Sequence, residues 1–477
     1  MKSPQEYLRK LYHDQFGQWP KSVFLIHSSG GSDRKYYRLV SGAGSAIGAW
    51  NRVKEENRAF LYFSRHFRSA GLPVPAIYSD DPDNDVYLIE DLGDISLLSI
   101  VEHACNKGTF PESVRDLYQQ TLKELIRFQV IAGKSLDYSL CYPRAEFDDR
   151  SMYWDLNYFK YYFLKLHVPF NEEKLEDDFR TIVSYLGQAG TNWFMYRDFQ
   201  ARNILIQDNQ PYFIDYQGGR KGPLQYDVAS LLFQVKAGLP PDFREELLEY
   251  YIEELTRHIS VDQSSFRQFY KGFALIRILQ VLGAYGFRGL IEKKPHFQLS
   301  IPGALANLEW WMNHEQIPVN LPELMKCLDM LTRLDDYRKP ADSNAGILTV
   351  AISSFSYKNS IPDDHSGYGG GFVFDCRALP NPGREEQYRA YTGKDPVIIK
   401  YFEDRPEVAE FLGNARNLVI QSIDNYLERG FDRLTVQFGC TGGQHRSVYC
   451  TERLSAILRE KYPEIIIKVD HPMIITK

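Results

Sequence analysis

A change of pattern across one short segment, Asp335–Gly346, constrains the fold more than any other feature of this sequence. The segment reads DDYRKPADSNAG, so it is charged, contains proline and holds few apolar residues, which is typical of a linker. Stretches with helical apolar spacing precede it, whereas short strand-like runs alternate with helices after it. At about 150 residues per domain, the chain would form roughly three folding units. We therefore predict units at 1–95, 96–335 and 347–477, with a linker at 336–346.

The two units before the linker differ in their periodicity. The runs expected to form strands in the first are Val23–His27, Lys35–Val40, Ser45–Trp50 and Val86–Glu90. Residues 54–70 predict a helix between them, since Pro73 and Pro75 forbid its continuation. Beyond Asp91 the apolar spacing predicts a helical lobe, interrupted at Trp193–Pro223 by two short strands. After the linker, the alternation predicts an α/β domain with a partly parallel sheet.

Composition and charge exclude several classes of protein. The 56 basic and 62 acidic residues give a net charge of −6, which disfavours a protein that mainly coats nucleic acid. The six cysteines form no C-x-x-C pair, so neither a zinc ribbon nor a thioredoxin-type site is indicated, and reduced thiols are expected. The N-terminus lacks an apolar signal core, and no run approaches about 18 apolar residues. We therefore expect a cytoplasmic protein without a membrane partner.

The segment from Tyr196 to Tyr216 carries the pattern of phosphoryl transfer. Asp198 lies five residues before Asn203, a short strand follows, and a second strand ends at Asp215. Transfer from ATP needs one carboxylate near the acceptor hydroxyl, and an amide oxygen and a second carboxylate that hold Mg²⁺ on the phosphates. A hairpin would bring the three side chains together. The alternative is that all three are ordinary turn and capping residues.

These residues resemble the catalytic loop and metal-binding strand of the aminoglycoside phosphotransferase-like kinases, distant relatives of protein kinases. The resemblance covers about residues 20–335 and implies a bilobal α+β protein-kinase-like domain, followed here by the smaller α/β domain. It implies ATP and Mg²⁺ as cofactors, Asp198 as the catalytic residue, and Asn203 and Asp215 as metal ligands. Asp227, in Gly222–Asp227, is expected to support the catalytic loop. The expected ATP-binding residues are Gly30, Gly31 and Ser32 in a phosphate-covering loop, and Glu90 and Leu92 at the hinge between the lobes.

The sequence departs from this family at two points. Tyr196 stands where the family has a histidine that mostly supports the loop. The strand expected to carry a phosphate-binding lysine, Ser45–Trp50, has none, and the nearest basic residues are Arg52 and Lys54. Glu56, which could have paired with that lysine, is expected to be an ordinary surface residue. The resemblance is nearest to the anomeric amino-sugar kinases of cell-wall recycling, on Arg197–Leu205 and Ile214–Leu232, and that subgroup is also expected to lack the lysine.

A second pattern, at Gly439–Val448, predicts an anion-binding loop. A strand runs into GCTGGQHRSV and a helix begins, so glycines, free N–H groups and basic side chains would meet an anion. The alternative is a tight turn capped by Ser447. The loop also fits the C-x₅-R-S signature of cysteine phosphatases, but without a general-acid loop of the expected kind. We expect Cys440 to be a small buried residue that lines the loop.

The loop resembles the C-terminal domain of the RNase adaptor protein RapZ, as does Phe374–Pro382, and the resemblance covers about residues 347–477. In that family the domain binds an amino-sugar phosphate and, in some members, a small RNA. The residues implied in sugar-phosphate binding are Asp375, Arg377, Cys440, Thr441, Gly442, Gly443, His445, Arg446 and Ser447. Residues 341–477 hold 16 basic and 18 acidic residues, a net charge of −2, so RNA is the less favoured partner.

Together these patterns predict an ATP-dependent phosphotransferase that acts on a small-molecule alcohol, with the anomeric hydroxyl of a cell-wall amino sugar as the expected acceptor. The C-terminal domain would bind a phosphorylated sugar. The alternative is a non-catalytic pseudokinase that reads a ligand or RNA through its C-terminal domain, since the lysine is missing and Tyr196 replaces the histidine.

Overall fold

The computed structural model describes residues 3–26, 34–104, 110–334, 337, 348–359, 361–362, 371–429, 431, 433–463 and 465–474. Internal contacts divide the chain into two compact units, Met1–Arg338 and Lys339–Lys477. The expected linker, residues 336–346, lies almost entirely outside the described residues, as do Gly30, Gly31 and Ser32 of the expected phosphate loop.

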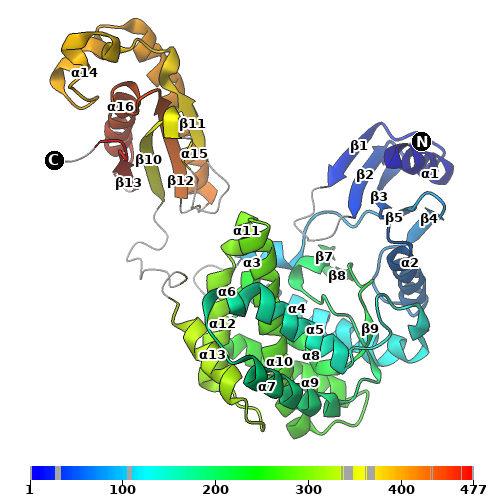
Figure 1. Cartoon of the computed structure of the whole chain (residues 1–477). Coiled ribbons are helices and arrows are strands. Elements are labelled where there is room, and N and C mark those ends of the chain that lie inside the picture. Colours follow the sequence, from blue (N-terminus) through cyan, green and yellow to red (C-terminus); the bar gives the residue numbers. More distant parts are fainter. Residues whose placement is uncertain are drawn as a thin grey trace. The chain divides into compact units, whose positions relative to one another are not determined.

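The first lobe is a five-stranded antiparallel sheet in the order β1-β2-β3-β5-β4 (Figure 1). The strands are β1 (Ser22–Ile26), β2 (Lys35–Ser41), β3 (Gly44–Trp50), β4 (Ile77–Asp81) and β5 (Val86–Glu90). The sequence did not predict β4, since its residues, IYSDD, lack a strand-like alternation. Helices α1 (Pro4–Phe16) and α2 (Lys54–Ser69) belong to this lobe. Helix α1 begins at a capping box between Ser3 and Glu6 and ends at Gly17, whose φ is +68°.

The two faces of this sheet bury different side chains because residues alternate along a strand. Tyr37, Leu39, Ala46, Val86 and Leu88 form one cluster with Leu8 and Tyr12 of α1. Gly48 is required on that face, since a Cβ there would lie 2.7 Å from Leu8 Cδ2. The opposite face, with Ala49 and Tyr87, joins the main core together with Phe60 of α2. This inner face therefore meets α2 and the second lobe.

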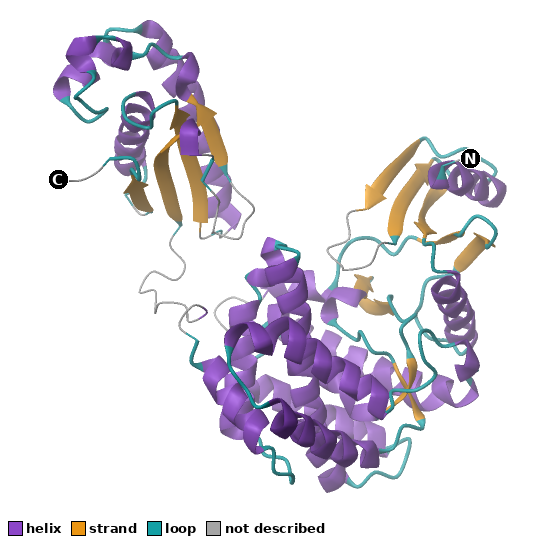
Figure 2. Ribbon diagram, viewed as in Figure 1, coloured by secondary structure: helices purple, strands orange, loops and turns teal. Residues whose placement is uncertain are grey.

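The second lobe is mostly helical (Figure 2). Its helices are α3 (Leu97–Ala104), α4 (Glu112–Ile126), α5 (Asp149–Phe159), α6 (Lys165–His167), α7 (Glu172–Leu186), α8 (Leu224–Leu232), α9 (Pro241–Thr256), α10 (Gln263–Tyr285), α11 (Pro295–Gln298), α12 (Ile301–His314) and α13 (Pro322–Thr332). Four short strands form two antiparallel pairs: β6 (Trp193–Met195) with β9 (Arg220–Gly222), and β7 (Ile204–Gln207) with β8 (Gln210–Phe213). The sequence predicted only two strands here, because β6 and β9 have three residues each.

Helix α10 is the centre of this lobe and packs against α5, α8 and α12. The stretch Gln263–Ile291, which includes α10, is long and apolar enough to cross a membrane by length and composition, although no such span was expected. Of the most apolar 18 residues of this stretch, 56% are buried inside the fold. The whole stretch also contains Arg267, Lys271 and Arg277, which make ion pairs. These properties are those of a core helix of this lobe.

The second unit contains one parallel sheet in the order β11-β12-β10-β13. Its strands are β10 (Thr349–Ser356), β11 (Phe372–Asp375), β12 (Arg433–Cys440) and β13 (Ile466–Asp470), and its helices are α14 (Pro396–Glu403), α15 (Pro406–Arg429) and α16 (Arg446–Lys461). Helix α16 packs on β10, β12 and β13, with α15 beside it. The predicted fold class is confirmed: a bilobal α+β kinase-like domain is followed by a smaller α/β domain. Helix α14 was not predicted.

Candidate active site and anion loop

The hairpin of β7 and β8 brings Asp198, Asn203 and Asp215 together. Asn203 Nδ2 donates to the backbone oxygen of Asp198 at 2.9 Å and lies 3.2 Å from Asp215 Oδ2. Because the amide nitrogen makes these contacts, Asn203 Oδ1 lies on the other side of the amide group. Asp198 keeps 44% of its side chain exposed, so a substrate can reach it.

Asp215 combines partial burial with a strained backbone. Burial raises the pKa of its carboxyl group, and the negative charge of Asp198 raises it further, while a hydrogen bond from Gln217 opposes the rise. The φ angle of Asp215 is +71°, and that of Arg197 is +81°, a region that residues other than glycine rarely adopt. The two carboxylates of Asp198 and Asp215 and the amide group of Asn203 supply oxygen atoms of the kind that a hard divalent cation prefers.

Asp227 supports the loop that carries Asp198. It is fully buried and accepts hydrogen bonds from the backbone N–H groups of Tyr196 (2.7 Å) and Arg197 (2.9 Å) and from Gln129 Nε2 (3.2 Å). Burial outweighs these bonds and raises the pKa of Asp227 to about 7. The Tyr196 hydroxyl donates to the backbone oxygen of Ile214 at 2.7 Å, so the residue that replaces the histidine ties this loop to the chain before Asp215.

Two arginine contacts at this site were missed by the sequence analysis. Arg277 of α10 is buried, and its Nη2 lies 3.7 Å from Asp198 Oδ1. Arg197 donates from Nη1 and Nη2 to the two carboxylate oxygens of Asp155 on α5, at 2.8 and 2.5 Å. A lone arginine within the apolar run ALIRILQVL could have indicated Arg277, but nothing in the sequence indicates which residue it faces.

The inner face of the first lobe corrects one expectation. Glu56 is not an ordinary surface residue: its Oε1 lies 3.0 Å from Arg34 Nη2, and its Oε2 accepts from Asn51 Nδ2 at 2.8 Å. The pair forms because Arg34, only 4% exposed, reaches α2 from the start of β2. The basic residues nearest the missing lysine point elsewhere: Arg52 stacks over Trp50, and Lys54 lies 3.7 Å from Asp85.

The two expected hinge residues lie at the end of β5. Glu90 closes the strand, and its Oε2 accepts from the backbone N–H of Ala76 at 3.0 Å and lies 3.3 Å from Arg68 Nη1. Leu92 is buried. The carboxylate of Glu90 is thus engaged with its own lobe.

In the second unit, the loop after β12 turns tightly around Cys440. The thiol is buried, its Sγ lies 3.2 Å from Ser447 Oγ, and it accepts from the backbone N–H of Gly443 at 3.2 Å. Burial opposes ionisation, but these hydrogen bonds win and lower the pKa of Cys440. Gly443 has a φ of +67°. Thr441 and Gly442 are exposed at the tip of the loop.

The basic side chains of this loop bind backbone carbonyls. Arg446 is buried and donates from Nη1 to the oxygens of Arg377 (2.8 Å) and Leu379 (3.2 Å). His445 Nε2 lies 3.0 Å from the oxygen of Tyr388, and burial lowers the pKa of its imidazole. Arg377 itself pairs with Asp375 at 2.7 Å. The loop is therefore fixed against residues 375–391 by its own cations.

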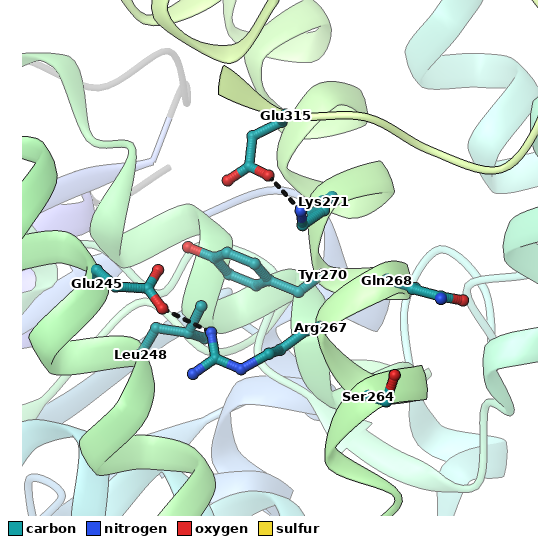
Figure 3. A pocket seen from close by; sticks show the side chains of 8 residues that line it. All are labelled: Glu245, Leu248, Ser264, Arg267, Gln268, Tyr270, Lys271 and Glu315. Atoms are coloured by element: carbon teal, nitrogen blue, oxygen red, sulfur yellow. Dashed lines mark hydrogen bonds and ion pairs between the residues drawn. The ribbon is translucent and has the colours of Figure 1, made fainter.

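A hollow of about 290 Å³ lies between α9 and α10, away from the residues predicted to act (Figure 3). Its lining residues are Glu245, Leu248, Ser264, Arg267, Gln268, Tyr270, Lys271 and Glu315. Arg267 pairs with Glu245 at 2.6 Å and Lys271 with Glu315 at 2.8 Å, as the dashed lines show. Within the described part of the chain, no group of three His, Cys, Asp or Glu residues could hold a metal. The set at Asp198 has two carboxylates and an amide.

Solved structures and curated proteins resemble parts of this chain. A nucleotide-binding protein of Halorhodospira halophila is 43% identical over 113 residues, 24% of this chain and 38% of that protein. Another, of Chromobacterium violaceum, is 34% identical over 158 residues, 31% of this chain and 55% of that protein. The chain spans about half the length of these relatives or less.

Two kinases are among the similar structures. An amicoumacin kinase in complex with AMP-PNP and Ca²⁺ has a TM-score of 0.48 and 12% identity, covering 68% of this chain and 97% of that chain. Choline kinase from Cryptosporidium parvum has a TM-score of 0.46 and 12% identity, covering 68% and 99%.

Two protein-family models match separate parts of the chain. Residues 24–259 match the phosphotransferase enzyme family, and residues 348–474 match the RapZ C-terminal domain. Both domain resemblances drawn from the sequence are thereby confirmed. The chain therefore contains one region that matches the phosphotransferase enzyme family and a second that matches the RapZ C-terminal domain.

Proposed function

We propose that the first unit transfers the terminal phosphoryl group of ATP to a hydroxyl of an amino sugar. The observation that carries this proposal is the convergence of Asp198, Asn203 and Asp215, with Asn203 Nδ2 bonded to the Asp198 backbone and 3.2 Å from Asp215. Each residue type matches one requirement of phosphoryl transfer.

In this mechanism Asp198 accepts the proton of the acceptor hydroxyl. The hydroxyl oxygen then bonds to the terminal phosphorus of ATP, and the bond between that phosphorus and ADP breaks. The exposure of Asp198 leaves it open to the acceptor, and Arg277, 3.7 Å away, keeps its carboxylate oriented. Asn203 Oδ1 and the Asp215 carboxylate would hold Mg²⁺, which neutralises charge on the phosphates when bound. Asp227 and Tyr196 support the loop through the hydrogen bonds described above.

The acceptor we favour is the anomeric hydroxyl of a cell-wall amino sugar. The support is the resemblance of Arg197–Leu205 and Ile214–Leu232 to kinases of that class. The second domain also supports an amino sugar as the acceptor, since it resembles a domain that binds an amino-sugar phosphate. A product or related compound of the first unit would then be a ligand of the second.

The ligand of the second domain would meet the exposed tip of its loop. Thr441 and Gly442 are exposed in the loop that leads into α16, whose first N–H groups favour an anion. Arg446 and His445 would act by fixing the loop, because their side chains bond to backbone carbonyls. Arg446 would add positive charge beneath it.

The kinase reading is tested by incubating the full chain with ATP, Mg²⁺ and a panel of amino sugars that includes N-acetylmuramate and N-acetylglucosamine. We expect sugar-dependent ADP release, and a kcat lower by roughly 10²- to 10⁴-fold for Asp198→Asn. Asp208→Asn, in the turn between β7 and β8, is the matched control and should keep wild-type turnover. If no acceptor raises turnover above background, the pseudokinase reading replaces this one.

The sugar-phosphate reading is tested at Gly442. A Cβ at this position meets nothing within 4 Å, so a side chain fits without strain. Glucosamine-6-phosphate binding, measured by calorimetry, should be lost in Gly442→Asp and kept in Gly442→Asn, because only the former adds a negative charge. Equal binding by both variants would show that the ligand, if bound, sits elsewhere.

A further inference from the structure

Strand β3 has no basic residue on the inner face of the first lobe, but Arg34 supplies one from the residue before β2. The inner-face residues of β3 are Ile47 and Ala49, and Ala49 pairs with Tyr36 on one side and Tyr87 on the other. Neither β3 residue is charged. Arg34 stands two residues before Tyr36, and its Nη1 donates to the Tyr36 hydroxyl at 3.1 Å. Its side chain therefore follows the same face toward α2.

Glu56 of α2 fixes this arginine. The ion pair with Arg34 Nη2 is 3.0 Å long, the arginine side chain is 1% exposed, and that of Glu56 is 22% exposed. Asn51 donates to the second oxygen of Glu56 and so fixes the carboxylate. A buried ion pair contributes little net stability compared with apolar packing, so its presence calls for another explanation.

Helix α2 connects this pair to the proposed metal ligands. Phe60, one turn after Glu56, stacks on Tyr216 with ring centroids 5.3 Å apart and planes 6° from parallel. Ser64, one further turn along, lies 2.6 Å from the Tyr216 hydroxyl. Tyr216 directly follows Asp215.

We propose that Arg34, held by Glu56, binds the phosphate chain of the nucleotide, so that an arginine directly before β2 supplies the positive charge that β3 lacks. The inference rests on the proposed function, since it assigns the cation of that same nucleotide site. A guanidinium suits this role because it can bind a carboxylate and a phosphate oxygen with different N–H groups. The missing lysine then no longer argues for a pseudokinase.

The test compares ligands with and without phosphates. AMP-PNP with Mg²⁺, and adenosine, are titrated by calorimetry into the full-length wild type, Arg34→Gln, Arg34→Lys and the control Arg52→Gln, which alters an exposed arginine of the same lobe. Arg34→Gln should weaken AMP-PNP binding by roughly tenfold to a hundredfold while adenosine binding stays within about twofold. Arg52→Gln should change neither.

Three results would overturn the inference: equal losses for both ligands, no loss for either, or no binding of AMP-PNP to the wild type. If Arg34→Gln fails to fold by circular dichroism, Arg34→Lys decides, since it keeps a charge beside Glu56 but shortens its reach. That variant should still lose at least about threefold for AMP-PNP relative to adenosine. Wild-type AMP-PNP binding without sugar turnover would refute the proposed function alone. Turnover with an unchanged KM for ATP in Arg34→Gln would refute this inference alone.

Discussion

The buried carboxyl group of Asp227 gives the sharpest test of how the loop that carries Asp198 is held. Its Oδ2 accepts from Tyr196 N and Gln129 Nε2, and its Oδ1 accepts from Arg197 N. In Asp227→Asn an amide NH₂ replaces one oxygen and cannot accept. The least costly orientation places the new NH₂ group against the backbone N–H of Arg197, because Oδ1 accepts only one hydrogen bond. This orientation removes that hydrogen bond and leaves two donors facing each other. We expect a loss of about 1–3 kcal/mol from this exchange at about pH 7 and above, where the carboxyl group of Asp227 loses its proton.

The pH dependence separates this loss from a general packing defect. The pKa of Asp227 is about 7 in the folded chain, against an ordinary value of 3.8. Between these values the folded protein keeps a proton that the unfolded chain has released, so this group's stabilisation falls as pH rises. Between the two pKa values the unfolding free energy falls by about 1.4 kcal/mol per pH unit. The asparagine variant has no such fall, because its amide does not titrate. The deficit of the variant should therefore shrink by about 2 kcal/mol from about pH 5 to about pH 7.

The measurement is urea denaturation of both proteins across this pH range, followed by intrinsic fluorescence. All other titrating groups are shared, so the difference in unfolding free energy isolates Asp227. Asp208→Asn, which alters an exposed turn residue, should show no such dependence. A deficit that stays constant with pH, or grows as pH rises, would refute the reasoning.

Three further substitutions test other contacts. Asp155→Ala leaves the Arg197 guanidinium, whose side chain is only 17% exposed, without its carboxylate and should cost about 3 kcal/mol of stability, measured by thermal or chemical unfolding. Tyr216→Phe removes the 2.6 Å hydrogen bond to Ser64 and should cost about 1 kcal/mol in the same assay, whereas an unchanged midpoint would contradict that bond. Gly439→Ala places a Cβ 2.4 Å from an aromatic ring and should destabilise the second unit by about 1–3 kcal/mol, seen as faster hydrogen exchange in β12.

Much of the fold followed from local patterns. The strands at Lys35–Ser41 and Val86–Glu90 and the helix at Arg446–Lys461 lie where periodicity and turn residues predicted them. Strand β4 and helix α14 were missed. The first is a polar segment that becomes a strand by pairing with β5, and tertiary context of this kind overrides local propensity.

Of the candidate site, the sequence indicated the residues joined by short loops. Asp198, Asn203 and Asp215 lie within one hairpin, so their spacing was enough to place them together. The charged residues that contact this hairpin could not be predicted from local sequence spacing. Arg277 reaches Asp198 from α10, and Asp155 reaches Arg197 from α5, because helices distant in the chain pack around the hairpin.

By itself, the sequence determined the division into two units, the phosphoryl-transfer pattern and the glycine-rich loop, because each depends on residues close together in the chain. Only the tertiary structure decided the partners of charged groups. It paired Arg34 with Glu56, and it turned Arg446 toward backbone carbonyls. Burial makes such pairings necessary, since a charge removed from water must find a partner, and the packing of distant segments determines which partner is within reach.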